Sequence, residues 1–187
     1  MMGNGKPRGA VGTAKPSLWH RRRGVLAAGV LIWSASFAAG WWYCGPPPDD
    51  LAAVRPEPGV DLFAEILLRN VGVASALWLS GLLTAGIGVT AVALAIGAMA
   101  GFSWGQALPV LGLGSVVRHV MPHMLLELLA IGIAVGAGLV PLPSLWRTVV
   151  GAGRTDWRVG MTDSGRLWGL SLVMLTVAAG VETWIST

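Results

Sequence analysis

The chain has 187 residues, of which 54% are hydrophobic and only 12% are charged. This composition, with a mean hydropathy of +0.67, excludes a soluble globular domain and indicates an integral membrane protein. The net charge of +4 comes from basic clusters beside apolar runs, with no basic face that alternates with stacking aromatic residues. We therefore expect the lipid bilayer, and no nucleic acid, as its surroundings.

The N-terminal region divides into a polar tail and an apolar run. Residues 1–23 are basic and rich in Gly and Pro, which predicts a disordered cytoplasmic tail. Residues 24–43 are uncharged and about as long as one bilayer crossing, which predicts a first transmembrane helix. A cleaved signal peptide is the alternative, because HRRRG and SASFAAG resemble its basic start and its cleavage site. The length of the run and its end at Trp41, Trp42 and Tyr43 favour a retained anchor.

An acidic region separates this anchor from the remaining apolar sequence. Residues 44–64 carry PPP, PEP and four acidic residues against one arginine, as expected for an extended external loop. Residues 61–70 (DLFAEILLRN) have the pattern of an interfacial amphipathic helix that leads into the second span. Residues 65–187 are then expected to form a four-helix membrane core.

The apolar runs of this core predict its spans. In chain order they are 71–85, 89–102, 121–140 and 167–185. The first two of these are short, so tilt or a re-entrant geometry is compatible with them. Residues 103–118 are predicted to be a link punctuated by Gly and Pro, and 141–166 a basic loop.

The distribution of basic residues predicts the orientation. Five spans with the N-terminus in the cytoplasm place the C-terminus outside, with ten basic residues inside and three outside. The sequence therefore predicts an all-α, multi-pass protein of the plasma membrane with about five transmembrane helices.

Glycines four residues apart mark faces on which helices can approach closely. Gly97, Gly101 and Gly105 form one such series, and Gly132 and Gly136 another. We expect them to pack helices within one chain, and a homo-oligomer through the same faces is the alternative.

Ionisable residues inside the predicted spans are the candidate functional residues. His123 and Glu127 lie in the fourth span, where a charged group costs roughly 2.5–3.5 kcal/mol. Pro122 is expected in the first turn of that helix. Glu127 is expected to point into the bundle towards a polar partner, for which His123, Asn70, Gln106 and an arginine at a bundle end are the alternatives.

A second acidic residue, Glu182, lies near the outer end of the last span. It is either a member of a buried polar set with His123 and Glu127 or an interfacial charge beside Trp184. Asn70 is a further candidate of that set. We expect Glu127→Gln or His123→Ala to disrupt assembly or activity.

Two kinds of chemistry are disfavoured by the same residues. His119, His123 and Glu127 recur every four residues and resemble a zinc ligand set. However, Pro122 places His119 before the helix, and the chain lacks HExxH, so we expect no metal, no cofactor and no catalytic residue. An intramembrane metal hydrolase is the least favoured function. The chain also lacks a GxxxxGK[ST] loop, so any ATPase must be a separate partner.

These motifs resemble the stage II sporulation protein M family of membrane proteins with about five spans. That family opens its fourth span with Pro-His-Gly-x-x-Glu, matched here by Pro122, His123, Met124 and Glu127, with Met in place of Gly. It also has an Ala-Ala-x-x-Glu segment, matched by residues 178–182.

Two further elements support the resemblance, which covers roughly residues 60–187. A phenylalanine-led amphipathic stretch that ends in Asn is matched by residues 63–70. The Asn-Gly-x-x-x-Gly of the third span is matched by residues 96–101, where Ile96 replaces the Asn. With Met124, this departure marks a divergent member.

The resemblance implies a non-enzymatic membrane scaffold or a subunit of a multi-protein assembly. The family's namesake acts with cell-wall hydrolases during engulfment in sporulation, which it anchors or localises. Other relatives are similar to proteins encoded beside ABC transporters or circular-bacteriocin genes. The alternative function is therefore a membrane subunit of peptide transport, as in bacteriocin export or immunity, with a separate ABC ATPase or permease as partner.

Overall fold

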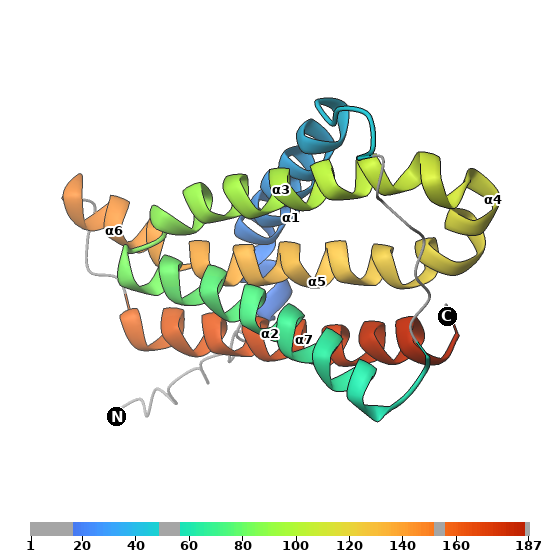
Figure 1. Cartoon of the computed structure of the whole chain (residues 1–187). Helices are drawn as coiled ribbons and strands as arrows, with labels where there is room; N and C mark the ends of the chain where they lie inside the picture. The colour runs from blue at the N-terminus through green and yellow to red at the C-terminus, as the bar shows by residue number, and fades with distance from the viewer. Residues whose placement is uncertain (1–16, 49–56, 152–155, 186–187) are drawn as a thin grey trace, which may run out of the picture.

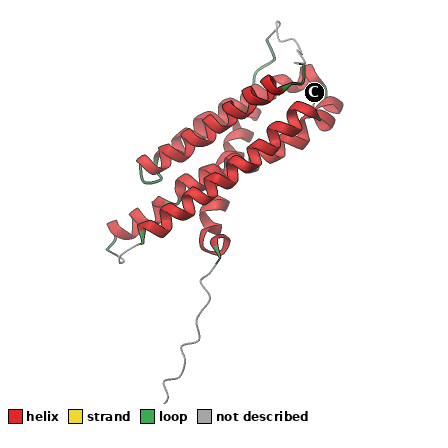
Figure 2. Ribbon diagram, turned by 90° about the horizontal axis from the view of Figure 1, so that it is seen from below, coloured by secondary structure: helices red, strands yellow, loops and turns green. Residues whose placement is uncertain are grey.

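The computed structural model describes residues 17–48, 57–151 and 156–185, and all regular structure within them is helical (Figures 1 and 2). Five helical segments there are long and apolar enough to cross a membrane. The prediction of an all-α fold with five spans is confirmed. The helices are α1 (Leu18–Trp42), α2 (Val60–Leu83), α3 (Gly88–Leu111), α4 (Leu113–Ser115), the π-helical turn η1 (Val116–Val120), α5 (Met121–Leu139), α6 (Pro141–Val149) and α7 (Trp157–Trp184). The predictions for residues 1–16 and 49–56 lie outside the described residues.

Helix α5 is the centre of the bundle. Helices α1, α2 and α7 all pack against it, and it lies between α2, α3 and α7 in Figure 1. Its second half, from Ala130 to Leu139, is buried almost throughout. This segment, AIGIAVGAGL, is apolar on every side and rich in small residues, so neighbouring helices can approach it from several directions.

Helix α1 crosses α3 and α5 steeply, whereas α3, α5 and α7 run alongside one another (Figure 1). Glycines permit this crossing. A Cβ atom on Gly29 would overlap backbone atoms of Gly132 and Gly136, and one on Gly101 would overlap the carbonyl of Phe37. Both glycine series are therefore covered by α1 of the same chain.

The remaining two predicted packing glycines lie on the same face of α3. A Cβ atom on Gly97 would come within 2.8 Å of Ser36, and one on Gly105 would overlap Cys44. A homo-oligomer that used these faces would first have to displace α1.

Helices α2 and α3 are longer than the short spans expected from the sequence. The stretch 61–70 belongs to α2 itself, so the amphipathic segment and the span form one continuous helix. Helix α3 continues through Pro109 to Leu111, and α4 and η1 connect it to α5. The segment 103–118, predicted to be a link punctuated by Gly and Pro, is thus helical except at Gly112. Pro109 has no N–H for the carbonyl four residues earlier, so the last turn of α3 lacks one hydrogen bond, and Gly112, with φ of 76°, ends the helix.

Two caps extend helices into segments predicted to be irregular. Ser17 accepts the backbone N–H of His20, so that α1 begins within the expected tail. Asp156 accepts the backbone N–H groups of Arg158 and Val159, so that α7 begins within the expected loop 141–166. That loop also contains α6, and the prediction of an irregular segment there is wrong.

Candidate functional site

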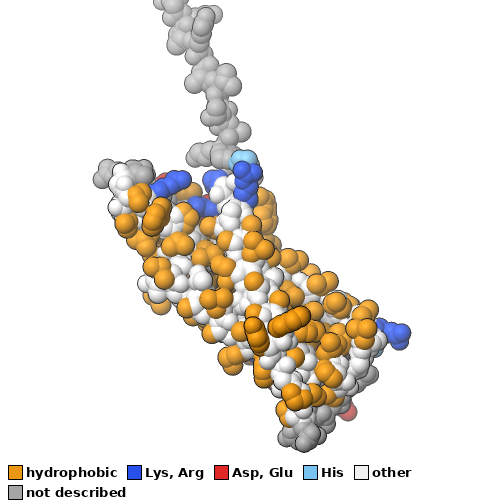
Figure 3. All heavy atoms as spheres, turned by 90° about the horizontal axis from the view of Figure 1, so that it is seen from above, with side chains coloured by type: hydrophobic (Ala, Val, Ile, Leu, Met, Phe, Trp, Pro, Cys, Tyr) orange, Lys and Arg blue, Asp and Glu red, His pale blue; other side chains and the backbone are white. Residues whose placement is uncertain are grey.

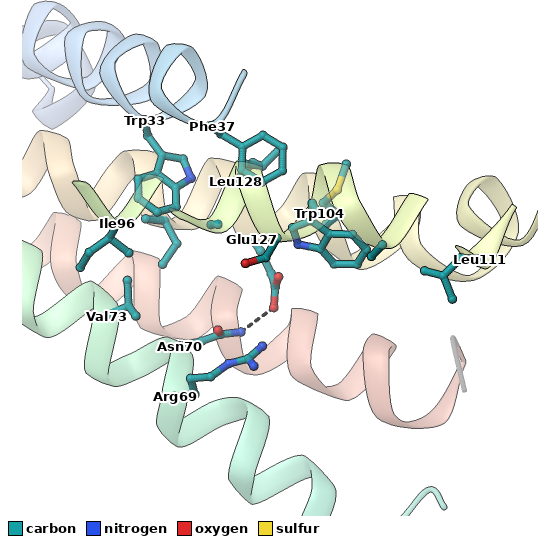
Figure 4. A pocket seen from close by; sticks show the side chains of 15 residues that line it. Trp33, Phe37, Arg69, Asn70, Val73, Ile96, Trp104, Leu111, Glu127 and Leu128 are labelled. Atoms are coloured by element: carbon teal, nitrogen blue, oxygen red, sulfur yellow. Dashed lines mark hydrogen bonds between the residues drawn. The ribbon is translucent and has the colours of Figure 1, made fainter. Parts of the chain in front are cut away.

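The candidate site begins with a hydrogen bond between α2 and α5. The side-chain amide of Asn70 donates to Oε1 of Glu127, and both side chains are half-buried (Figure 4). Because α2 is continuous from Val60, Asn70 lies inside a helix and faces α5. Of the partners expected for Glu127, the structure selects Asn70. Gln106 instead donates to the carbonyl of Pro46 at 3.3 Å.

The Asn70–Glu127 pair lies in the wall of a pocket of about 480 Å³ formed by α1, α2, α3 and α5. The polar side chains Arg69, Asn70 and Glu127 lie together on one side of this pocket (Figure 4). The other walls are aromatic and aliphatic. They are formed by Trp33, Phe37, Val73, Ile96, Ala100, Ser103, Trp104, Ala107, Leu111, Met124, Leu128 and Ile131. The pocket can therefore hold an apolar group and offer it a polar contact at one edge.

The pocket wall also contains an unused hydrogen-bond donor. The indole N–H of Trp33 is buried and makes no hydrogen bond within the described residues, although the side chain is only 4% exposed. Buried polar groups are nearly always paired, so each exception needs an explanation. Trp33 lines the pocket, but its N–H is itself buried within the wall.

Glu182 joins this region from α7. It is half-buried and within electrostatic range of Glu127 and Arg69. Nearby, Trp184 stacks on Phe63 with ring centroids 5.2 Å apart, which ties the end of α7 to the start of α2. We call Arg69, Asn70 and Glu127, which line the pocket, together with Glu182, which lies behind its wall within electrostatic range of them, the pocket cluster.

His123 and Pro122 lie outside this cluster. Pro122 is exposed in the first turn of α5. His123 is buried, but its side chain hydrogen-bonds to the backbone of His119 and does not line the pocket. His119 lies in the π-helical turn η1, directly before α5. Among the described residues, no three His, Cys, Asp or Glu side chains are arranged to hold a metal ion.

A second polar cluster, at the opposite end of the bundle, was not predicted. Nη2 of Arg21 lies 2.8 Å from Oδ1 of Asp163, and Nε of Arg22 lies 2.9 Å from Oδ2. Asp163 is only 1% exposed, so α1 and α7 are joined by a buried carboxylate between two guanidinium groups. From the sequence, the arginines were predicted to lie in the tail of residues 1–23 and Asp163 in the loop of residues 141–166. One feature of the sequence could have indicated this cluster. Asp163 is an acidic residue just before the last apolar run, on the side of the membrane where most basic residues were predicted.

Serine hydroxyl groups provide further bonds between α5 and α7. Ser164 donates to the carbonyl of Ala137 at 2.8 Å, and Ser171 donates to that of Ala130 at 2.7 Å. Ser164 also accepts the indole N–H of Trp78, which connects α2 to the same pair of helices. These bonds hold the bundle together on the side of α5 facing α7.

Comparison with known proteins identifies the family. A family model described as "Stage II sporulation protein M" matches residues 27–187. No curated protein and no solved structure gave a match. The matched segment contains all five membrane-length helical segments except the first residues of α1. The chain belongs to the stage II sporulation protein M family.

Proposed function

We propose that this protein is a non-enzymatic scaffold or subunit of a multi-protein assembly in the plasma membrane, and that a partner's membrane segment docks in the pocket. The observation that carries this proposal is the Asn70–Glu127 pair in the pocket wall. A carboxylate inside a membrane span is costly unless it has partners. One amide bonds one of its oxygens, and the half-buried side chain remains accessible from the pocket for a second partner.

The surroundings of the pocket favour docking over conduction. Trp33 and Ile131 belong both to its wall and to the main apolar core, where Leu77, Val89 and Val135 are also buried. A path for a solute through the bundle would need further polar side chains beyond the wall formed by Trp33 and Ile131. The apolar core instead closes the pocket on this side, as expected for a recess that receives a side chain or a helix.

The lining indicates the chemistry of the partner. Aromatic rings of Trp33, Phe37 and Trp104 suit an apolar helix surface. Glu127 suits a basic or hydroxyl side chain on that helix, for which a hydrogen bond in lipid has few competitors. We propose a membrane-anchored cell-wall remodelling protein as this partner, in line with the role of the family's namesake.

Site-specific photo-crosslinking in native membranes tests this proposal. A photoreactive residue at Ser103, in the pocket wall, is compared with one at Val173, which is 62% exposed on the outer face of α7. We expect a discrete protein adduct from position 103 alone, and loss of this adduct when Glu127→Gln is added. Mass spectrometry then identifies the partner.

The outcomes separate the functions. A cell-wall hydrolase in the adduct supports the scaffold, whereas an ABC ATPase or permease would replace it with the transport function. Identical adducts from positions 103 and 173, or an adduct that Glu127→Gln leaves unchanged, would contradict docking in the pocket.

A further inference from the structure

A second pocket lies at the opposite end of the bundle, between α1, α6 and α7. Its volume is about 520 Å³, and three arginines line it: Arg21, Arg22 and Arg147. Pro143 and Ser144 of α6, the N-cap residue Asp156 and Val159 of α7 complete most of the wall. The proposed function makes no use of this pocket.

The buried carboxylate of Asp163 orients two of these arginines. It accepts Nε and Nη2 of Arg21 at 3.2 and 2.8 Å, and Nε of Arg22 at 2.9 Å. Nη2 of Arg22 lies 4.0 Å from where a Cβ atom on Gly160 would be, so the guanidinium group lies beside the first turn of α7. Within the described residues, the Nη atoms of Arg22 make no hydrogen bond. They are therefore donors held in place beside the pocket.

The charge around the pocket favours an anion. Asp163 offsets one charge of the arginine pair, and Asp156 is occupied as the N-terminal cap of α7. Arg147 forms no ion pair within the described part of the chain. Further exposed arginines belong to the same end of the bundle, where Figure 3 shows basic side chains gathered: Arg23, Arg158 and Arg166. The N-terminus of α7 adds positive potential.

Exposed aromatic residues place the pocket at the depth of lipid headgroups. Trp19, Trp146 and Trp157 are 54%, 66% and 42% exposed and lie on α1, α6 and α7, the helices that form the pocket. Tryptophan gathers at the membrane–water interface, and basic pockets between membrane helices bind anionic headgroups. We infer that the pocket lined by Arg21, Arg22 and Arg147 binds the phosphate group of an anionic membrane lipid.

Native mass spectrometry of the purified full chain in detergent tests this inference. Phosphatidylglycerol is titrated against phosphatidylcholine, and bound lipid is counted on the wild type, Arg147→Gln and Arg158→Gln. The control Arg158→Gln removes the same charge from the same end, but Arg158 does not line the pocket. We expect preference for phosphatidylglycerol, a loss of about fivefold in Arg147→Gln, and no change in Arg158→Gln. The melting curve of Arg147→Gln should match the wild type, because Arg147 is exposed and its loss leaves the Asp163 pairs intact.

Three results would overturn the inference. Equal binding of the two lipids would show that headgroup charge is not recognised. Equal losses in the two variants would show that general surface charge, and not this pocket, holds the lipid. Displacement of phosphatidylglycerol by inorganic phosphate alone would show that the site takes phosphate from solution.

Discussion

The two carboxylates Asp163 and Glu127 lie in helices of membrane length, but in opposite surroundings. Asp163 is 1% exposed and paired with two arginines of α1. Glu127 is half-buried, bonded to one amide and open to a pocket. The first arrangement is saturated within the chain and ties α7 to α1. The second leaves bonding capacity for another molecule, so the same chemical group is structural at one end and available for recognition at the other.

The largest effect is expected from Asp163→Asn. The change removes the charge that lies between Arg21 and Arg22, and removal of one member of a buried ion pair is strongly destabilising. We expect a marked fall in the midpoint of thermal unfolding in detergent and in the yield of folded protein. Asp156→Asn is the matched control, because Asn caps a helix about as well as Asp. If Asp163→Asn and the wild type unfolded at the same temperature, the ion pairs of Asp163 would not stabilise the fold.

Glu127→Gln should act on recognition with little effect on folding. Gln keeps the shape and can still accept the amide of Asn70, so the unfolding midpoint should stay near that of the wild type. Partner capture should fall roughly tenfold or more, because this is the loss in affinity expected when a hydrogen bond to a charged group is removed. Glu65→Gln, on an exposed position of α2, is the control and should capture normally. If Glu127→Gln still captured the partner, the Asn70–Glu127 pair would have only a structural role within the chain.

Ser171→Ala should produce a small loss of stability and none of recognition. Ser171 donates to Ala130 across the α5–α7 interface, and such bonds in membranes contribute about 0.6 kcal/mol. Chemical unfolding in detergent measures the change. Thr176→Ala is the comparison, since Thr176 is exposed and donates to the Leu172 carbonyl of its own helix. An equal cost in both variants would mean that the interhelical bond contributes nothing of its own.

The smallest effect is expected from Glu182→Gln. Glu182 makes no hydrogen bond within the described residues and interacts with Glu127 and Arg69 only at longer range. The unfolding free energy should change by less than about 0.5 kcal/mol. Partner capture, measured by the same crosslink, should change less than in Glu127→Gln. A loss as large as that of Glu127→Gln would place Glu182 at the centre of the site.

The five spans and part of the site could be predicted from local sequence. Long apolar runs indicate spans; Glu127 and Glu182 are acidic residues within two of these runs, and Asn70 stands directly before another. Helical spacing also grouped His123 with Glu127, but the structure bonds His123 to the backbone of His119. A spacing of four residues indicates that two side chains share one face of a helix. Which groups each side chain then contacts depends on the helices packed against that face.

The unpredicted features depend on contacts between distant segments. Arg21 and Asp163 are separated by 142 positions, and no local pattern joins them. The glycines on α3 and α5 that allow α1 to cross were identified from the sequence as packing positions. The sequence did not show that α1 is the helix that packs against them. Helical structure around Pro109 was missed because a proline usually marks the end of a helix, whereas α3 continues through it to Leu111.

The most direct test of the account compares Glu127→Gln with Asp163→Asn, measuring pocket crosslinks per folded molecule in the same membranes. We predict that Glu127→Gln stays folded and loses the crosslink. We also predict that Asp163→Asn yields fewer folded molecules, each of which crosslinks as the wild type does. If the crosslink in both variants simply follows the amount of folded protein, Glu127 has no role of its own in recognition, and the central claim is wrong.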